Sequence, residues 1–150
     1  MAKYIQGKFR PKNPSKYTGD VTNIQFRSSW EASFCNRCDT DPNIIEWSSE
    51  EVVVPYISPL DRKQHRYFVD FKIKVRTVDG HLKTYLVEIK PKKQMIEPKK
   101  TATNKATKRY IHEVTTYLVN QAKWSAADIY CQKRGYEFLI LNEDDLNIKR

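Results

Sequence analysis

At 150 residues, with 39% hydrophobic and 30% charged residues, the chain is long enough for one globular domain with a single core. No apolar run is long enough to cross a bilayer, and the first thirty residues contain nothing that resembles the apolar core of a signal peptide. Three cysteines, an odd number, argue against a disulfide framework and for a reducing compartment. The net charge of +9 favours a polyanionic partner, with nucleic acid ahead of a membrane surface.

The chain opens with a basic segment, residues 1–20, which we expect to be an arm ahead of a single domain over residues 21–150. Prolines and glycines break any regular period in this arm, and its aromatic residues are suited either to stacking on bases or to packing against the domain. A second basic segment, residues 90–109, indicates a loop that enters a helix. Both segments are suited to following a phosphate backbone, although solvated tails are the simpler alternative. The residues that we assign to nucleic-acid binding are Lys8, Arg10, Lys12, Lys16, Lys92, Lys93, Lys99 and Lys100.

Hydrophobic periodicity places the regular elements along the chain. They are a helix at 27–39, strands at 43–47 and 51–57, a hairpin within 65–93, a helix from about 105 to 134 and a strand at 136–142. We expect Asn120 to break the long helix and Gly135 to end it. The order α-β-β-β-α-β predicts an α/β (α+β) fold, in which helices flank a mixed central sheet of about four to five strands.

The register of the hairpin decides which side chains share a face. A two-residue turn would place charged residues on the apolar face, whereas a three-residue loop at residues 78–80 pairs Phe71 with Val87 and Ile73 with Tyr85. Because a slip of one residue moves every side chain to the other face, the pattern selects the three-residue loop. A glycine that follows an aspartate at the end of this loop is typical of a type I turn with a left-handed closing residue.

In that register Asp70 lies opposite Glu88, with the two Cβ atoms about 5 Å apart. Two ionised carboxylates at this separation repel each other by about 3 kcal/mol at an effective dielectric constant near 20. Proton sharing, a salt bridge to Lys90 and a divalent cation are three ways to relieve the repulsion. Mg²⁺, which prefers oxygen ligands, matches the net negative charge of the group. A solvated cluster of Asp, Glu and Lys is the alternative, and the spacing alone leaves both open.

Two motifs carry a family resemblance. Val69-Asp70, followed by Glu88-Ile89-Lys90 at the end of an apolar strand, resembles the PD-(D/E)xK nuclease superfamily, with valine in place of the proline of the motif. The segments GKFRPKNPSKYTGD, FRSSWE, FVDF, VEIKP and NQAKWSAA extend the resemblance, over essentially the whole chain, to the head-completion nucleases of T-even-type phages.

The resemblance implies a restriction-endonuclease-like core and Mg²⁺-dependent hydrolysis of phosphodiester bonds in double-stranded DNA, with Mn²⁺ as a substitute ion. Asp70, Glu88 and the backbone carbonyl of Ile89 would bind the metal, and Lys90 would orient or activate the attacking water. It also implies endonuclease or exonuclease activity that trims packaged DNA, contacts with head or portal components rather than a membrane, and action in the cytoplasm of an infected host. Association with the virion and homo-oligomer formation stay open.

Two interpretations fit Glu31. It is similar to the acidic first-helix residue of TnsA-like transposase endonucleases, which would make it a catalytic residue and a metal ligand. Ser28 and Glu31 also form the pattern of a capping box, in which a first-turn carboxylate is favoured for structural reasons. Two further functions stay open for the whole chain: a non-catalytic DNA-binding protein that joins heads and tails, and a structure-specific endonuclease of the TnsA or resolvase type.

Overall fold

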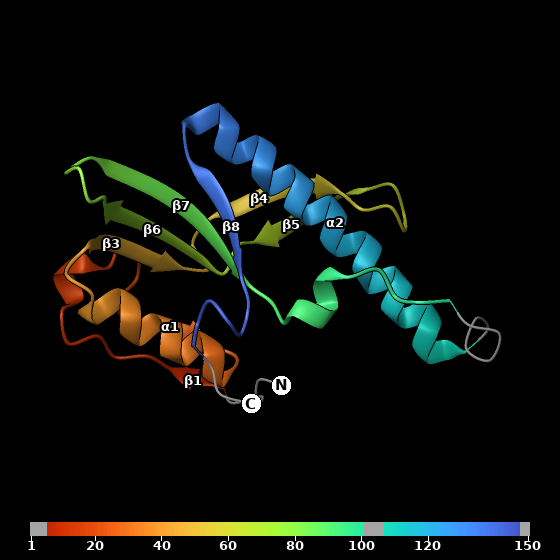
Figure 1. Cartoon of the computed structure of the whole chain (residues 1–150), viewed down its shortest axis with the longest axis horizontal. Coiled ribbons are helices and arrows are strands. Elements are labelled where there is room, and N and C mark those ends of the chain that lie inside the picture. The colour runs from red at the N-terminus through yellow and green to blue at the C-terminus, as the bar shows by residue number, and fades with distance from the viewer. Residues whose placement is uncertain (1–5, 101–106, 148–150) are drawn as a thin grey trace.

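A four-stranded sheet between two helices forms the centre of the molecule (Figure 1), a computed structural model that describes residues 6–100 and 107–147. The elements of this centre are α1 (Ser29–Thr40), β3 (Ile44–Ser49), β6 (Phe71–Arg76), β7 (Leu82–Ile89), α2 (Lys108–Arg134) and β8 (Glu137–Leu141). The strand order is β3-β6-β7-β8, with β8 parallel to β7 and the other neighbours antiparallel. This mixed sheet and its α-β-β-β-α-β order confirm the predicted fold class.

The two helices cover opposite faces of the sheet. Alternate residues of β7 show this, since they belong to core clusters that contain different helices. Val87 and Ile89 belong to the core cluster that contains Phe34 of α1. Leu86 belongs to the cluster that contains Trp124 of α2. Successive side chains of a strand point to opposite faces, so Glu88, which follows Val87, faces the α2 side.

The loop of the β6–β7 hairpin has the predicted length and register. Phe71 pairs with Val87 and Ile73 with Tyr85. The backbone N–H of Thr77 donates to the carbonyl of His81 at 2.8 Å, which leaves three residues in the loop. Gly80 closes it at φ +85°, a conformation that glycine adopts at little cost.

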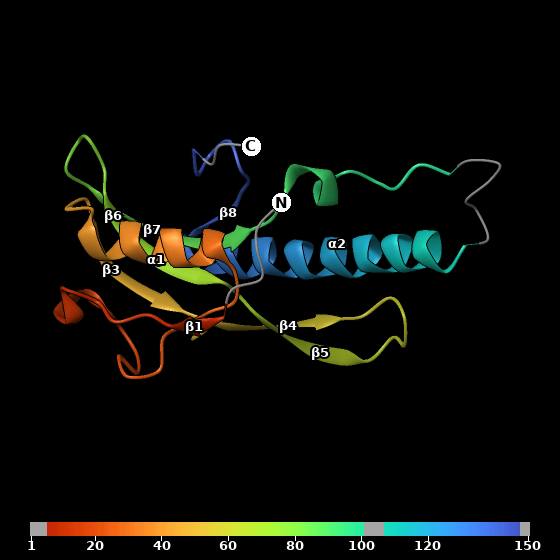
Figure 2. The same cartoon turned by 90° about the horizontal axis from the view of Figure 1, so that it is seen from below.

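The first arm of the predicted hairpin is not one strand, and this expectation was wrong. The arm divides into β5 (Gln64–Phe68) and β6, and β5 pairs with β4 (Val53–Ile57) in a separate two-stranded ribbon that runs beside α2 (Figure 2). The chain crosses from the ribbon to the central sheet at residues 69–70. Two backbone hydrogen bonds hold this crossing, from Val69 N–H to the carbonyl of Val52 at 3.0 Å and from Glu50 N–H to the carbonyl of Asp70 at 3.1 Å.

The described part of the basic arm, residues 6–20, packs on the domain. It contains β1 (Gly7–Lys8), which pairs with β2 (Gln25–Phe26), and the 3₁₀ turn η1 (Pro14–Lys16). Tyr17 is buried against Trp47, with ring centroids 4.8 Å apart. Phe9 also makes an edge contact with Trp47, with ring centroids 5.8 Å apart. Phe9 and Tyr17 therefore pack against the domain, which is one of the two alternatives for the aromatic residues of the arm.

α2 is one continuous helix, so the predicted break at Asn120 was wrong. Asn120 is 5% exposed and lies one turn before Trp124 on the buried stripe that continues to Ala127 and Cys131. Gly135 ends the helix as predicted, in the left-handed conformation at φ 72°. The predicted start near residue 105 lies outside the described residues. Among the helices of the described part, none is long and apolar enough to span a membrane.

Candidate active site

The structure brings Asp70 and Glu88 together at the edge of the central sheet where β7 ends. Asp70 lies between β5 and β6, and its Oδ2 accepts a hydrogen bond from the backbone N–H of Ile89 at 2.8 Å. Glu88 is 5% exposed. Glu88 lies near enough to Asp70 for its charge to raise the pKa of Asp70. The predicted register therefore gives the predicted neighbours.

The surroundings of Asp70 disfavour the ionised form of its carboxyl group. Asp70 retains some accessible surface, but its carboxyl group is enclosed by protein, and this burial is the main reason why its pKa lies well above the ordinary value. The charge of Glu88 raises the pKa of Asp70 further, while the N–H of Ile89 lowers it. Asp70 therefore holds a proton more readily than an exposed aspartate would.

Three groups surround Glu88. The indole Nε1–H of Trp124 donates to Glu88 Oε2 at 3.3 Å, and the Nζ of Lys90 lies 3.8 Å from the same oxygen. The hydroxyl of Tyr67 lies beside Glu88, and the charge of Glu88 helps to raise the pKa of Tyr67 after the larger effect of burial. Lys90 thus provides the predicted positive charge next to the acids.

Two buried donors near this site make no hydrogen bond within the described part of the chain. They are the hydroxyl of Tyr67 and the side-chain amide Nδ2 of Asn120, one helical turn from Trp124. An unsatisfied buried donor costs about 1–3 kcal/mol. Two of them on the side of the sheet that carries Glu88 suit a site whose remaining partners are oxygens of a bound molecule.

Glu31 lies near the carboxylate pair, and its helix is capped as predicted. Ser28 Oγ accepts a hydrogen bond from the backbone N–H of Glu31 at 3.1 Å. Burial is the main cause that raises the pKa of Glu31, with a further contribution from the charge of Glu50, and the charge of Glu31 in turn adds to the raised pKa of Asp70. Ser28 therefore caps the helix, and its hydroxyl donates to Glu31 Oε2 at 3.4 Å, while Glu31 is also near enough to influence the pair.

The oxygen ligands available at this site suit a small hard cation held by two carboxylates and a backbone carbonyl, but not one held by three carboxylates. Over residues 6–100 and 107–147, no three His, Cys, Asp or Glu side chains lie close enough together to hold a metal ion, so Glu31 does not complete a three-carboxylate set with Asp70 and Glu88. The two carboxylates with the carbonyl of Ile89 form an oxygen-only set at the end of β7. Such a set suits Mg²⁺, which is commonly bound through one or two carboxylates plus water and substrate phosphates.

Two of the predicted nucleic-acid-binding residues, Lys16 and Lys92, contact oxygen atoms within the domain. Lys16 Nζ donates to the carbonyls of Asp39 at 3.1 Å and Asp41 at 2.8 Å at the end of α1. Lys92, in the 3₁₀ turn η2 (Lys92–Met95), forms an ion pair with Asp144. All of the predicted residues except Lys16 are exposed: Lys8, Arg10, Lys12, Lys92, Lys93, Lys99 and Lys100. Their role in DNA binding stays a prediction.

The sequence pattern indicated a helix break at Asn120 and no role at the site for Tyr67 or Trp124. The signal in the sequence was a polar residue four positions before a tryptophan in a helix, which places both on one face. Of the other polar residues in this part of α2, Gln121 is exposed, and Lys123 Nζ lies 5.6 Å from the centre of the Tyr67 ring.

Comparison with known proteins agrees with this geometry. The family described as "TnsA-like endonuclease N terminal" matches residues 41–143, a range that contains Asp70, Glu88 and Lys90. The protein named "Head completion nuclease" of Enterobacteria phage T4 is 44% identical over 142 residues, which cover 93% of this chain and 92% of that protein. No solved structure matches the chain.

Proposed function

The chain belongs to the TnsA-like endonuclease family, and on that basis we propose that it is a metal-dependent deoxyribonuclease that hydrolyses phosphodiester bonds of double-stranded DNA. The observation that carries the proposal is the buried contact of Asp70 with Glu88, with the Lys90 amine 3.8 Å from Glu88. Without a cation this contact costs folding free energy, whereas with one it forms a binding site.

Asp70, Glu88 and the carbonyl of Ile89 are the groups that would hold Mg²⁺, with Mn²⁺ as a substitute. A bound ion of this kind polarises a phosphoryl oxygen and lowers the pKa of bound water. The chain itself fixes the ligands, since the N–H of Ile89 positions Asp70 and the indole N–H of Trp124 positions Glu88. Ligands that are held in place before the reaction need no reorganisation during it.

Lys90 contributes a positive charge at a fixed place. Its side chain is 24% exposed, and Glu88 keeps its amine beside the carboxylates. An amine in this position stabilises negative charge that develops on the phosphate oxygens and orients the attacking water. The neutral replacement Lys90→Met keeps most of the aliphatic stem, and we expect it to lower the rate of cleavage by about 100-fold.

The similarity to the T4 protein, which extends over nearly all of both chains, supports a role in head completion. In this role the enzyme would trim packaged DNA, as an endonuclease or an exonuclease, before or during head–tail joining. Its partners would be double-stranded DNA and components of the head or portal. It would act in the cytoplasm of the infected host, with a fraction bound to virions.

Plasmid DNA incubated with the purified protein tests the enzymatic part of the proposal. We expect nicked or linear DNA with Mg²⁺ and none with EDTA. Glu88→Gln should abolish cleavage while DNA binding persists, and Glu137→Gln, the same change at a surface carboxylate on β8, should cleave as the wild type does. Equal cleavage by Glu88→Gln and the wild type would leave only a DNA-binding protein that joins heads and tails.

A further inference from the structure

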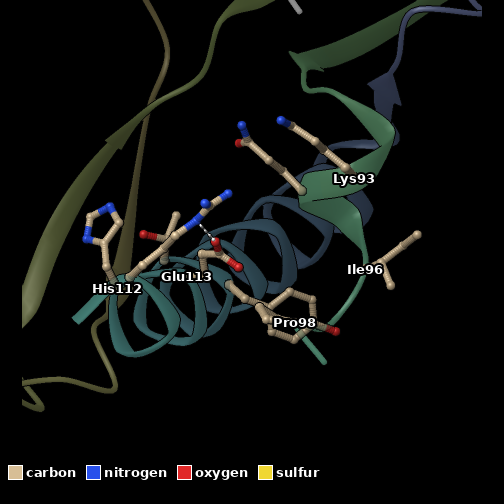
Figure 3. Close-up of a pocket in the computed structure, with 9 residues that line it drawn as sticks. Lys93, Ile96, Pro98, His112 and Glu113 are labelled. Carbon is tan, nitrogen blue, oxygen red and sulfur yellow. Dashed lines mark hydrogen bonds and ion pairs between the residues drawn. The ribbon is translucent and has the colours of Figure 1, made fainter. Parts of the chain in front are cut away.

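A cavity of about 560 Å³ lies between α2 and the segment that follows Lys90. One wall contains Lys93 and Ile96, and the other is formed by the first three turns of α2 (Figure 3). Its volume is in the range of about 300–1,000 Å³ that is usual for ligand sites. Asp70, Glu88 and Lys90 do not line it, so it is a separate site.

The lining of the cavity contains two cations, Lys93 and Arg109, and one carboxylate, Glu113, so its net charge is positive. Lys93 makes no ion pair with any residue of the described ranges, in contrast to its neighbour Lys92, which is bound to Asp144. Arg109 Nε contacts Glu113 Oε1 at 3.0 Å, and the Arg109 side chain is 91% exposed. The guanidinium is therefore held from one side while its outer N–H groups stay accessible, a geometry suited to phosphate oxygens.

The same cavity has apolar and aromatic walls. Tyr117 and Pro98 line it together with Ile96, which is 64% exposed to solvent. A base can stack on such a surface whatever its identity, because every base has a flat π-face. Cations beside an aromatic surface are the usual combination in sites for unpaired nucleotides.

The cavity and the carboxylate pair share two elements of the chain, α2 and the segment that follows β7. Lys93 follows Lys90 by three residues, and Tyr117 precedes Trp124 by seven, which corresponds to about 10 Å along a helix. Trp124 contacts Glu88. The cavity and the carboxylate pair therefore contact the same helix, about two turns apart.

We infer that this cavity binds one unpaired nucleotide of the strand being cut, with its phosphate at Lys93 and Arg109 and its base against Tyr117. The inference rests on the proposed nuclease function and narrows its substrate to DNA with a single-stranded end, flap or frayed terminus. A base that is paired within a duplex is not available for the cavity, so blunt duplex gains nothing from it.

Fluorescence anisotropy in EDTA, where no cleavage occurs, tests the inference with one duplex that is either blunt or carries a short single-stranded overhang. We expect the wild type to bind the overhang duplex about tenfold more tightly. Tyr117→Ala should remove this preference, because one stacked base contributes roughly a tenfold or larger change in affinity. Lys93→Gln should weaken it by several-fold.

Matched controls separate the cavity from the general surface. Leu118→Ala changes an adjacent side chain that is 46% exposed, and Lys133→Gln makes the same charge change at the far end of α2; both should keep the preference. Equal affinity of the wild type for both duplexes, or an unchanged preference in Tyr117→Ala, would overturn the inference. We expect deoxyadenosine monophosphate to compete only at concentrations at least 100-fold above the oligonucleotide, and competition at equal concentration would assign the cavity to a free nucleotide instead.

The outcome is distinguishable from that of the plasmid assay. Cleavage of plasmid without a preference for overhangs would keep the nuclease and remove the nucleotide site. A preference for overhangs that Tyr117→Ala removes, in a protein that cleaves nothing with Mg²⁺, would remove the nuclease and keep a site for single-stranded DNA.

Discussion

Two aspartates of the domain, Asp39 in the last turn of α1 and Asp70 between β5 and β6, are held in opposite ways. Asp39 is 1% exposed, and its two carboxylate oxygens each accept a backbone N–H at 2.9 Å, from Asn13 and Lys12. Asp70 accepts one backbone N–H, and its other close neighbour is a second acid, Glu88.

The two aspartates therefore differ in whether the folded protein satisfies their charge. The charge of Asp39 is satisfied, and its hydrogen bonds hold the N-terminal segment against α1. Asp70 instead faces a like charge in an enclosed position, which costs free energy in the folded protein. Local conflicts of this kind are expected where a site serves a ligand rather than the fold.

The largest expected effect is on catalysis, where the same substitution should act differently at the two positions. Asp70→Asn should lower Mg²⁺-dependent cleavage by about 1,000-fold or more, since it removes a carboxylate that would hold the ion. Asp39→Asn should leave the rate per folded molecule within about threefold. Initial rates of plasmid cleavage, corrected for the folded fraction, measure both. Similar losses in the two variants would contradict the distinction.

Stability should respond in the opposite sense. Asp39→Ala should lower the free energy of unfolding by about 2–4 kcal/mol, because two backbone N–H groups lose a charged acceptor. Asp70→Asn in EDTA should raise it, because the repulsion with Glu88 disappears. Urea unfolding followed by circular dichroism gives both values. A destabilised Asp70→Asn protein would mean that the charge of Asp70 supports the fold.

The gain from Asp70→Asn should depend on pH with a defined sign. The pKa of Asp70 in the folded protein is raised, so the wild type loses stability as pH rises above the unfolded-state value near 3.9, and the loss is complete above the folded-state pKa. The melting temperatures of wild type and Asp70→Asn in EDTA should therefore agree at low pH and diverge as pH rises. Parallel curves across the whole range would show that the Asp70 carboxyl group titrates normally.

The smallest effect is expected at Glu31. Glu31→Gln keeps the backbone N–H that Ser28 accepts, so the free energy of unfolding should change by less than about 0.5 kcal/mol. Cleavage should fall by less than about tenfold, since this side chain influences Asp70 from outside the two-carboxylate set. A loss as large as that of Asp70→Asn would instead make Glu31 a metal ligand.

Local patterns predicted the part of the site that lies within one hairpin. The alternation of apolar and charged residues in β6 and β7 allows one register, and that register places Asp70 beside Glu88. The helix cap at Ser28 and the end of α2 at Gly135 were predictable for the same reason, because each depends on a few adjacent residues.

Features that depend on distant parts of the chain were not predictable. The division of the first arm at residues 69–70 follows from the pairing of β5 with β4, and nothing within residues 64–76 indicates it. Asn120 resembled a helix terminator, but its burial beside Trp124 is set by the packing of α2 on the sheet. Asp39 contacts Asn13 and Lys12 of the N-terminal segment, which precede it in the sequence by 26 and 27 positions.

A crystal structure of the protein grown with saturating Mn²⁺, with the ion located by anomalous scattering, tests the central claim most directly. We predict a manganese peak between the carboxylates of Asp70 and Glu88, next to the carbonyl of Ile89. A peak elsewhere, or none at this pair, would contradict the assignment of the two acids to metal binding.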